Sequence, residues 1–215
     1  SDPAYFFTAH SAWCPMKKSS NATIKMKRPE LSSLEWKDDE GSSTSKGLVG
    51  KKLTLSASCN GDTDDGAGVI FRVFPDGADV ERDQPVAELA STNKGGKAEA
   101  EWTYHYEHDP ENPLKEKPKY LFTVTTQKAK KQKSGNVEIN EKHKILLHDK
   151  QGKALSNTKM TVLLSDSTTK SVTSDGDGKA ELKDCIPGVI SSIKITNDKG
   201  ETEEFEFTVN ITEDN

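Results

Sequence analysis

The chain has 215 residues and a net charge of -5, and 30% of its residues are charged while 32% are apolar. So low an apolar fraction favours two small domains over one large core, because small domains bury a smaller share of their surface. The negative charge argues against nucleic-acid binding, which requires lysine and arginine gathered on one face. No apolar run approaches the about 20 residues that cross a membrane as a helix. We therefore expect neither a nucleic-acid partner nor a membrane span.

Short apolar runs that alternate with polar residues recur through the first part of the chain, and helical periodicity is nearly absent. Residues 53–59 alternate between apolar and hydroxyl side chains, which is typical of a strand with one face in a core. Residues 69–74 form a more continuous apolar run that predicts a central strand, and Pro75 ends it. Further strands are expected at residues 23–26, 34–36, 86–90, 98–106, 120–124 and 136–139, and polar loops at residues 38–46 and 107–119.

The alternating pattern restarts after residues 140–142. Strands are expected there at residues 145–147, 160–164, 171–173, 180–182, 189–195 and 205–211, with turns at residues 149–152 and 175–178. Closely spaced strands with turn signals between them are the sequence signature of a β-sandwich. The chain is therefore predicted to be all-β, with two tandem β-sandwich domains at residues 1–140 and 141–215.

The second predicted domain carries three recognisable phrases: DKQGKALSN at residues 149–157, TSDGDGKA at residues 173–180, and Ile186-Pro187-Gly188. Together they resemble the transthyretin-like (prealbumin-like) repeat of bacterial proteins over about residues 141–211, although Ala154 stands where proline is common and Ser174 intervenes before Asp175. The first domain resembles the immunoglobulin-like modules that precede such repeats, through its strand rhythm and residues 96–102.

These resemblances have functional implications. Transthyretin-like repeats occur at the C-terminal ends of type VI secretion spike proteins (the VgrG family) and in phage-tail-like proteins. The resemblance therefore implies a bacterial protein with a docking or spacer role, located in a secretion or contractile injection apparatus, or secreted to the cell surface. It implies a protein partner within a larger assembly and no chemistry of the chain's own.

An aromatic segment after the glycine turn is the strongest candidate for a contact surface. On a strand, Trp102, Tyr104 and Tyr106 would share one face, because side chains alternate with a period of two. Tyrosine and tryptophan favour interfaces, although a stripe packed against the core is the alternative. A zinc site here would have only three ligands. The predicted partner-binding residues are Trp102, Tyr104, His105, Tyr106, His108 and Asp109.

Metal ions and cofactors are not expected. The weak calcium candidates Asp62, Asp64, Asp175 and Asp177 lie in acidic stretches without the ligand spacing of a calcium loop, and acidic β-turns are the preferred interpretation. Cys14 and Cys59 either form a disulfide or remain separate thiols.

We therefore expect a non-catalytic structural and interaction module. A carbohydrate-binding or adhesive module is one alternative, and it requires exposed rings among Trp13, Trp36, Trp102 and Tyr104. The other alternative is a pair of accessory domains of a larger hydrolase.

Overall fold

The computed structural model describes residues 8–11, 14–18, 28–61, 63–127, 129–149, 151–196 and 202–205. Every helix or strand element in these ranges is a β-strand, and the prediction of an all-β protein is confirmed. The same ranges contain no helix that could cross a membrane. The strands are β1 (Thr8–Ser11), β2 (Cys14–Lys18), β3 (Glu30–Lys37), β4 (Lys46–Leu48), β5 (Lys52–Asn60), β6 (Gly68–Pro75), β7 (Ala87–Thr92), β8 (Lys97–Thr103), β9 (Lys119–Thr126), β10 (Gln132–Lys133), β11 (Val137–Leu146), β12 (Lys159–Leu164), β13 (Thr169–Thr173), β14 (Lys179–Cys185), β15 (Ile190–Thr196) and β16 (Thr202–Phe205).

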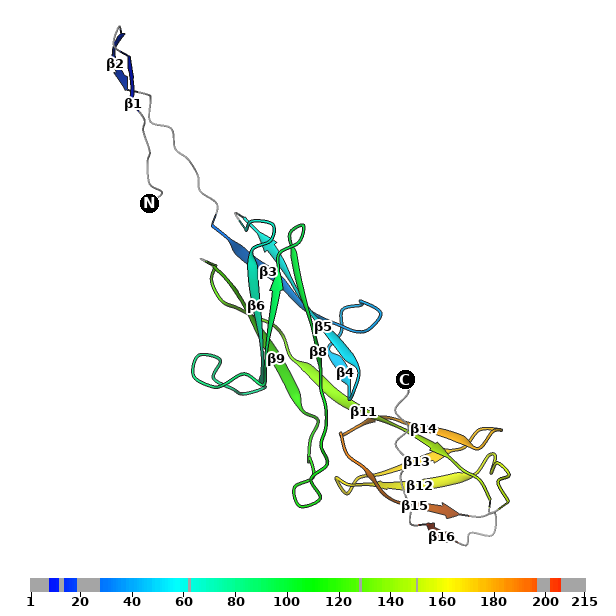
Figure 1. Cartoon of the computed structure of the whole chain (residues 1–215). Helices are drawn as coiled ribbons and strands as arrows, with labels where there is room; N and C mark the ends of the chain where they lie inside the picture. The colour runs from blue at the N-terminus through cyan, green and yellow to red at the C-terminus, as the bar shows by residue number, and fades with distance from the viewer. Residues whose placement is uncertain are drawn as a thin grey trace.

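The first sandwich packs two sheets face to face (Figure 1). One sheet has the order β3-β5-β8, and the other has β11-β9-β6-β7, with β4 running parallel to β11 and β10 pairing with β9. The strand predicted at residues 53–59 is β5, in which Leu53, Leu55, Ala57 and Cys59 are all buried. The predicted alternation therefore places one face of β5 in the core.

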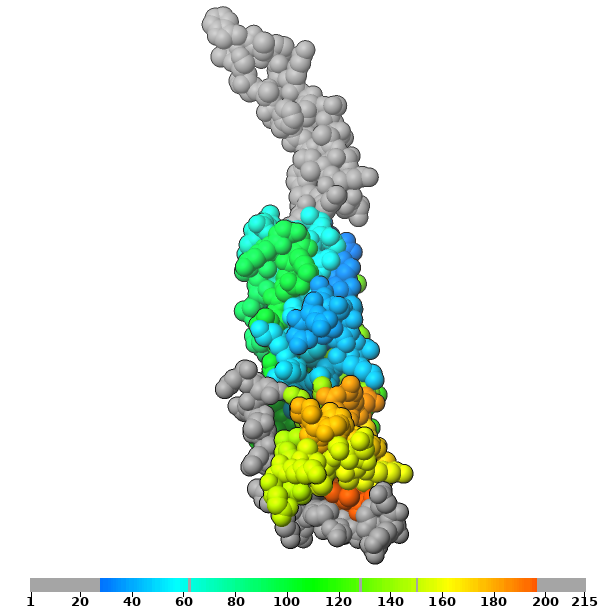
Figure 2. All heavy atoms as spheres, turned by 90° about the vertical axis from the view of Figure 1, so that its right-hand side faces the viewer, coloured from blue at the N-terminus to red at the C-terminus, as the bar shows by residue number. Residues whose placement is uncertain are grey.

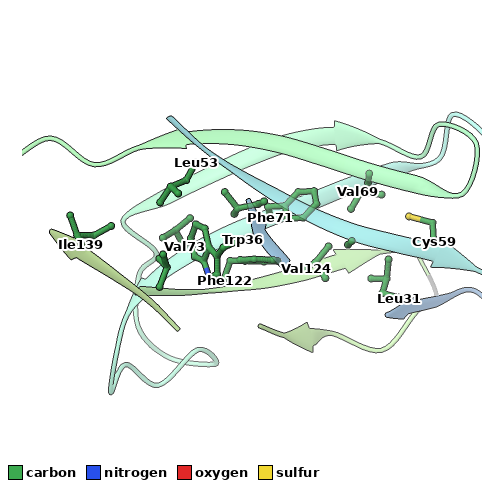
Figure 3. Packing of buried hydrophobic residues seen from close by; sticks show 14 residues of the cluster. Leu31, Trp36, Leu53, Cys59, Val69, Phe71, Val73, Phe122, Val124 and Ile139 are labelled. Carbon is green, nitrogen blue, oxygen red and sulfur yellow. The ribbon is translucent and has the colours of Figure 1, made fainter. Parts of the chain in front are cut away.

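Aromatic rings fill the centre of this sandwich (Figure 3). The Trp36 ring meets the edge of Phe122 at a centroid distance of 5.0 Å, and Phe71 lies 5.7 Å from Phe122. The Trp36 indole Nε1–H donates to the carbonyl oxygen of Gly135 at 3.0 Å, so its polar atom is satisfied inside the core. Burying each such side chain contributes about 1.5–3 kcal/mol, which makes this cluster a main source of stability.

Strand β11 belongs to both halves of the molecule. Residues 137–140 pair with β9 and β4 in the first sandwich, and residues 141–146 pair with β14 in the second. The second sandwich faces this β11–β14 pair with the sheet β13-β12-β15-β16, around a core that includes Ile145, Met160, Val162 and Leu182. Figure 2 shows this sandwich, in yellow and orange, next to one end of the first. The predicted domain boundary at residue 140 thus lies inside a continuous strand and stays a prediction.

Several predicted strand limits differ from the structure. The strand predicted at residues 98–106 ends at Thr103, because its partner β5 begins at Lys52, which pairs with Thr103. Before Lys52 the chain turns at Gly50, whose φ is 71° and whose N–H donates to the Tyr104 carbonyl oxygen at 2.9 Å; the ladder ends there. The strand predicted at residues 136–139 continues to Leu146. The strand predicted at residues 23–26, and residues 206–211 of the last one, lie outside the described residues.

Candidate functional site

The predicted contact segment divides into two groups of side chains. Trp102, at the end of β8, packs against Tyr120 of β9 at 5.0 Å, and Tyr104 lies 5.5 Å from Tyr120. All three rings are half-buried against the first core. Burial, together with the neighbouring Tyr120, raises the pKa of Tyr104 to about 12. The phenol therefore stays neutral, and this group packs against the first core.

The second group lies on the surface loop at residues 104–118. The Tyr106 hydroxyl is 3.3 Å from Nδ1 of His108. β8 ends at Thr103, so the predicted strand face does not extend to Tyr104 and Tyr106. In the loop, His105 is exposed and Tyr106 is half-buried. Asp109 binds its own loop instead, because its carboxylate accepts from the Asn112 amide at 3.2 Å and from the Glu111 N–H at 2.9 Å. These bonds lower the pKa of Asp109.

The rings required for a carbohydrate platform are buried or half-buried in the described part of the chain. Trp36 is only 3% exposed, and the Trp102 ring makes edge contacts with the rings of Tyr104 and Tyr120. Trp13 lies outside the described residues.

A cluster of charges that the sequence analysis missed lies where the loop returns to β9. The Asp184 carboxylate, in β14 of the second sandwich, accepts from Lys117 at 2.8 Å and from Lys46 at 3.3 Å. Lys117 also contacts Glu138 of β11 at 3.3 Å. Hydrogen bonds from Lys117, and then from Lys46, lower the pKa of Asp184. This junction cluster therefore ties the two sandwiches together electrostatically.

A β-bulge in β14 aims Asp184 at the first sandwich. Glu141 is paired with Cys185 but His143 with Leu182, so Lys183 and Asp184 together face the single residue Lys142. Asp184 has a φ of 59°, in the left-handed region that aspartate tolerates better than most residues. Bulges re-aim side chains in this way. The position of Asp184 depends on the pairing of β14 with β11, which are distant in the sequence. No local sequence pattern therefore predicts it.

Lys170 of β13 holds the bulge from the other sheet. Its ammonium donates to the carbonyl oxygens of Lys183 at 2.8 Å and Asp184 at 3.0 Å. The side chain thus covers the open edge of β14 and fixes the backbone that presents Asp184 to Lys117.

The acidic turns use their carboxylates to bind backbone. The Asp175 Oδ1 atom accepts from the N–H groups of Asp177 and Lys179, each at 2.9 Å, and Asp149 binds its own turn in the same way. The Asp177 carboxylate contacts the Lys179 ammonium at 3.3 Å. The carboxylates of the two calcium candidates in this loop, Asp175 and Asp177, therefore bind groups of their own acidic β-turn.

Of the other two calcium candidates, the structure describes only Asp64. The Asp64 carbonyl oxygen accepts from the Ala67 N–H at 3.1 Å, and Asp62 lies outside the described residues. Among the described residues, no three His, Cys, Asp or Glu side chains gather around a point that could hold a metal ion.

Two of the three cysteines are buried thiols. Cys59 is 5% exposed in the first core and Cys185 is 1% exposed in the second, and neither is in a disulfide. Burial raises the pKa of both thiols, which keeps them protonated at neutral pH. The Cys14 side chain lies outside the described part of the chain.

These elements define an all-β protein built from β-sandwiches. No family model matches the chain, and no curated protein does. Among solved structures, the chain is similar to extracellular domains 3–5 of Drosophila OTK, with 10% sequence identity and a TM-score of 0.28. That alignment covers 85% of this chain and 64% of the OTK chain. The all-β class rests on the strands themselves.

Proposed function

We propose that this chain is a non-catalytic structural and interaction module, which acts as a stiff spacer and docks to a larger protein assembly. The observation that carries the proposal is the continuity of β11, one strand that is hydrogen-bonded into both sandwiches. A flexible linker would let two domains move independently, whereas a strand paired on both sides of the boundary does not.

The junction cluster supports the same spacer role. Asp184 contacts Lys46 and Lys117, which come from two different segments of the first sandwich. Two lysines that converge on one carboxylate from separate segments restrain rotation about β11 as well as bending. The angle between the sandwiches is therefore held by side chains in addition to the shared backbone.

The docking surface in this proposal is the loop at residues 104–118. It carries the exposed His105, the Tyr106–His108 pair and, near its end, Lys117 of the junction cluster. A partner bound to this loop lies beside both sandwiches. The transthyretin-like phrases of the second half, built around Asp149 and Asp175, favour a bacterial secretion or contractile injection apparatus as the larger assembly.

Distances between two spin labels test the spacer role. Labels at Glu101→Cys in the first sandwich and Thr169→Cys in the second, both exposed positions, are measured by pulsed electron resonance with Cys14 replaced by serine. A narrow distance distribution is expected, and a broad one contradicts a stiff spacer.

A photo-crosslinking amino acid at His105 tests the docking role in the cells that produce the protein. One discrete crosslinked component of a secretion or injection apparatus is expected, and the same residue placed at Asp177, on the turn between β13 and β14, should not give it. Crosslinks that are diffuse, or equal at the two positions, overturn the docking assignment.

A further inference from the structure

The second sandwich holds a cluster of polar and charged side chains at the end that adjoins the first sandwich, where β11 meets β14 (Figure 1). Glu141 and His143 of β11 are half-buried and alternate with exposed residues, so both face the interior of the second sandwich. Lys170 of β13 is half-buried from the facing sheet. Charged groups rarely enter a core without a specific partner. The partners of these three side chains therefore decide what the cluster can do.

The His143 imidazole has a buried nitrogen without a partner. Its Nε2 atom makes no hydrogen bond. A neutral ring tolerates this better than a charged one, because an imidazolium has two N–H groups that each need an acceptor. Burial, and then the charge of Lys170, lower the pKa of His143. The folded chain therefore keeps this ring uncharged at neutral pH, and the site is poorly suited to a further proton.

Lys170 connects this ring to the junction cluster. Its ammonium donates to the carbonyl oxygens of Lys183 at 2.8 Å and Asp184 at 3.0 Å. These two residues form the β-bulge beside the pairing of His143 with Leu182. Asp184 in turn makes the ion pairs with the first sandwich. A charge on His143 would therefore act first on Lys170, and through it on the backbone that positions Asp184.

The other titratable groups around His143 come from three elements. Glu141 lies on the same face of β11, and burial raises the pKa of its carboxyl group. Cys185 of β14 is paired with Glu141, and burial raises the pKa of its thiol. Asp166, on the turn before β13, has one carboxylate oxygen buried without a partner. The buried side chains of β12 and β15 are apolar, apart from the Ser192 hydroxyl. Glu141 thus loses its charge at a higher pH than an ordinary glutamate, which adds to the positive charge that His143 gains.

We propose that His143 is an acid-sensitive release for the junction between the sandwiches: its protonation repels the Lys170 ammonium from the bulge carbonyls, and the spacer becomes flexible in mildly acidic surroundings. The inference rests on the spacer role proposed above. Two positive charges in a poorly solvated interior repel each other strongly. Lysine can relieve the repulsion by turning its long side chain out to water, because its stem is flexible. The bulge then loses the two charge-assisted hydrogen bonds that clamp it.

The bulge is predisposed to change once this clamp is gone. Asp184 has a φ of 59°, and a left-handed backbone at a residue other than glycine persists only where its surroundings enforce it. Its side chain is 56% exposed, so the ion pairs with Lys117 and Lys46 are weak restraints by themselves. Loss of the bonds from Lys170 should therefore let Asp184 move away from both lysines.

Spin-label distances measured as a function of pH test the release. Labels are attached at Glu101→Cys and Thr173→Cys, both exposed positions, with Cys14 replaced by serine. This pair avoids Thr169, which is next to Lys170. The distance distribution should be narrow at about pH 8 and broad at about pH 5, which lies below the ordinary histidine pKa of about 6.5 and above the about 4 of ordinary carboxyl groups. A distribution that stays narrow overturns the release and leaves the spacer intact, whereas a broad one at every pH contradicts the spacer itself.

Three substitutions identify the group that triggers the release. His143→Gln keeps a polar side chain that does not titrate, and it should keep the distribution narrow at about pH 5. His148→Gln removes an exposed histidine of the same half of the chain and should leave the broadening unchanged. Glu141→Gln should leave a clear broadening as well. Equal behaviour of the two histidine variants overturns the proposal, and so does a broadening that only Glu141→Gln removes.

Lys170→Met tests the connection between the ring and the bulge, because it removes the ammonium and keeps a long side chain. The distribution should already be broad at about pH 8 and should change little with pH. A narrow distribution there would show that Lys170 does not transmit the charge. Far-UV circular dichroism at each pH separates release from unfolding, since both sandwiches should keep their signal while the distances broaden. Broadening that coincides with loss of this signal contradicts the release.

Discussion

The Asp184 carboxylate of the second sandwich lies 2.8 Å from the Lys117 ammonium of the first. The side chain of Asp184 is 56% exposed, whereas that of Lys117 is 19% exposed. Exposed ion pairs add little to folding stability. The contact is therefore better understood as fixing the orientation of the two sandwiches than as holding either of them folded.

Asp184→Asn should loosen the angle between the sandwiches without unfolding them. Asparagine also tolerates a positive φ, so the bulge is kept while the attraction to Lys46 and Lys117 is lost. The spin-label distance distribution proposed above should broaden, and the urea midpoint should change little. Asp177→Asn removes a more exposed ion pair, with Lys179 on the turn between β13 and β14, and should leave the distances unchanged. Equal broadening in the two variants would show that the junction cluster does not set the angle.

Two glycines of one turn should respond very differently to substitution by alanine. Gly178 has a φ of +76°, and a Cβ atom there would lie 2.5 Å from the carbonyl oxygen of Leu147. Gly176 has no such φ and no atom within 4 Å of its Cβ position. Gly178→Ala should lower the free energy of unfolding by about 1–2 kcal/mol from the left-handed backbone alone, and further through the steric conflict. Gly176→Ala should be nearly neutral, and urea titrations followed by circular dichroism compare the two.

Asp175→Ala should destabilise the same turn through lost hydrogen bonds. Its carboxylate accepts from two backbone N–H groups, and removing it should cost about 1–3 kcal/mol, because hydrogen bonds to charged groups are stronger than neutral ones. Asp177→Ala, which removes only an exposed contact with Lys179, is the matched control. Urea midpoints that shift equally in the two variants would contradict a turn-binding role for Asp175.

The second sandwich should lose stability as the pH falls below neutrality. His143 of β11 has a buried Nε2 atom without a hydrogen-bond partner, and burial together with the charge of Lys170 lowers its pKa. The unfolded chain therefore takes up a proton near the ordinary histidine pKa of about 6.5, where the folded chain does not. Above that pH the histidine is neutral in both states, and its titration costs the folded state nothing. As the pH drops from there toward the lowered pKa of the folded chain, the free energy of unfolding falls.

Circular dichroism should be used to follow this loss. Tryptophan fluorescence is unsuitable, because Trp36 and Trp102 lie in the first sandwich and do not report on the second. The urea midpoint should fall as the pH is lowered through about 6.5, and His143→Gln should remove most of this dependence. A pH dependence that persists in His143→Gln would assign it to another group.

Local sequence patterns predicted the strands and turns that depend only on neighbouring residues. The alternation at residues 53–59 identified β5 and its buried face, and the acidic glycine turns lie at residues 149–152 and 175–178 as expected. The continuation of β11 past Asn140 was missed because residues 141–144 are charged or polar, and alternate between half-buried and exposed without an apolar signal. The pairing with β14 holds that stretch in the strand, including an ion pair of Lys142 with Glu181.

The candidate site was predicted only in part, for a related reason. The aromatic residues near Trp102 were found, but the end of β8 at Thr103 depends on where its partner strand begins. The sequence did not predict a role for Asp184, because that role depends on a β-bulge that forms only when β14 pairs with β11.

The shared strand also imposes an order on biosynthesis. Chains leave the ribosome N-terminus first, and domains generally fold in that order. Residues 137–140 complete the first sheet by pairing with β9 and β4, and this step anchors the strand on which β14 later assembles. The second sandwich thus begins to fold on a strand that the first sandwich already holds in place. Mutations that slow the first half should delay the second, whereas the converse does not follow.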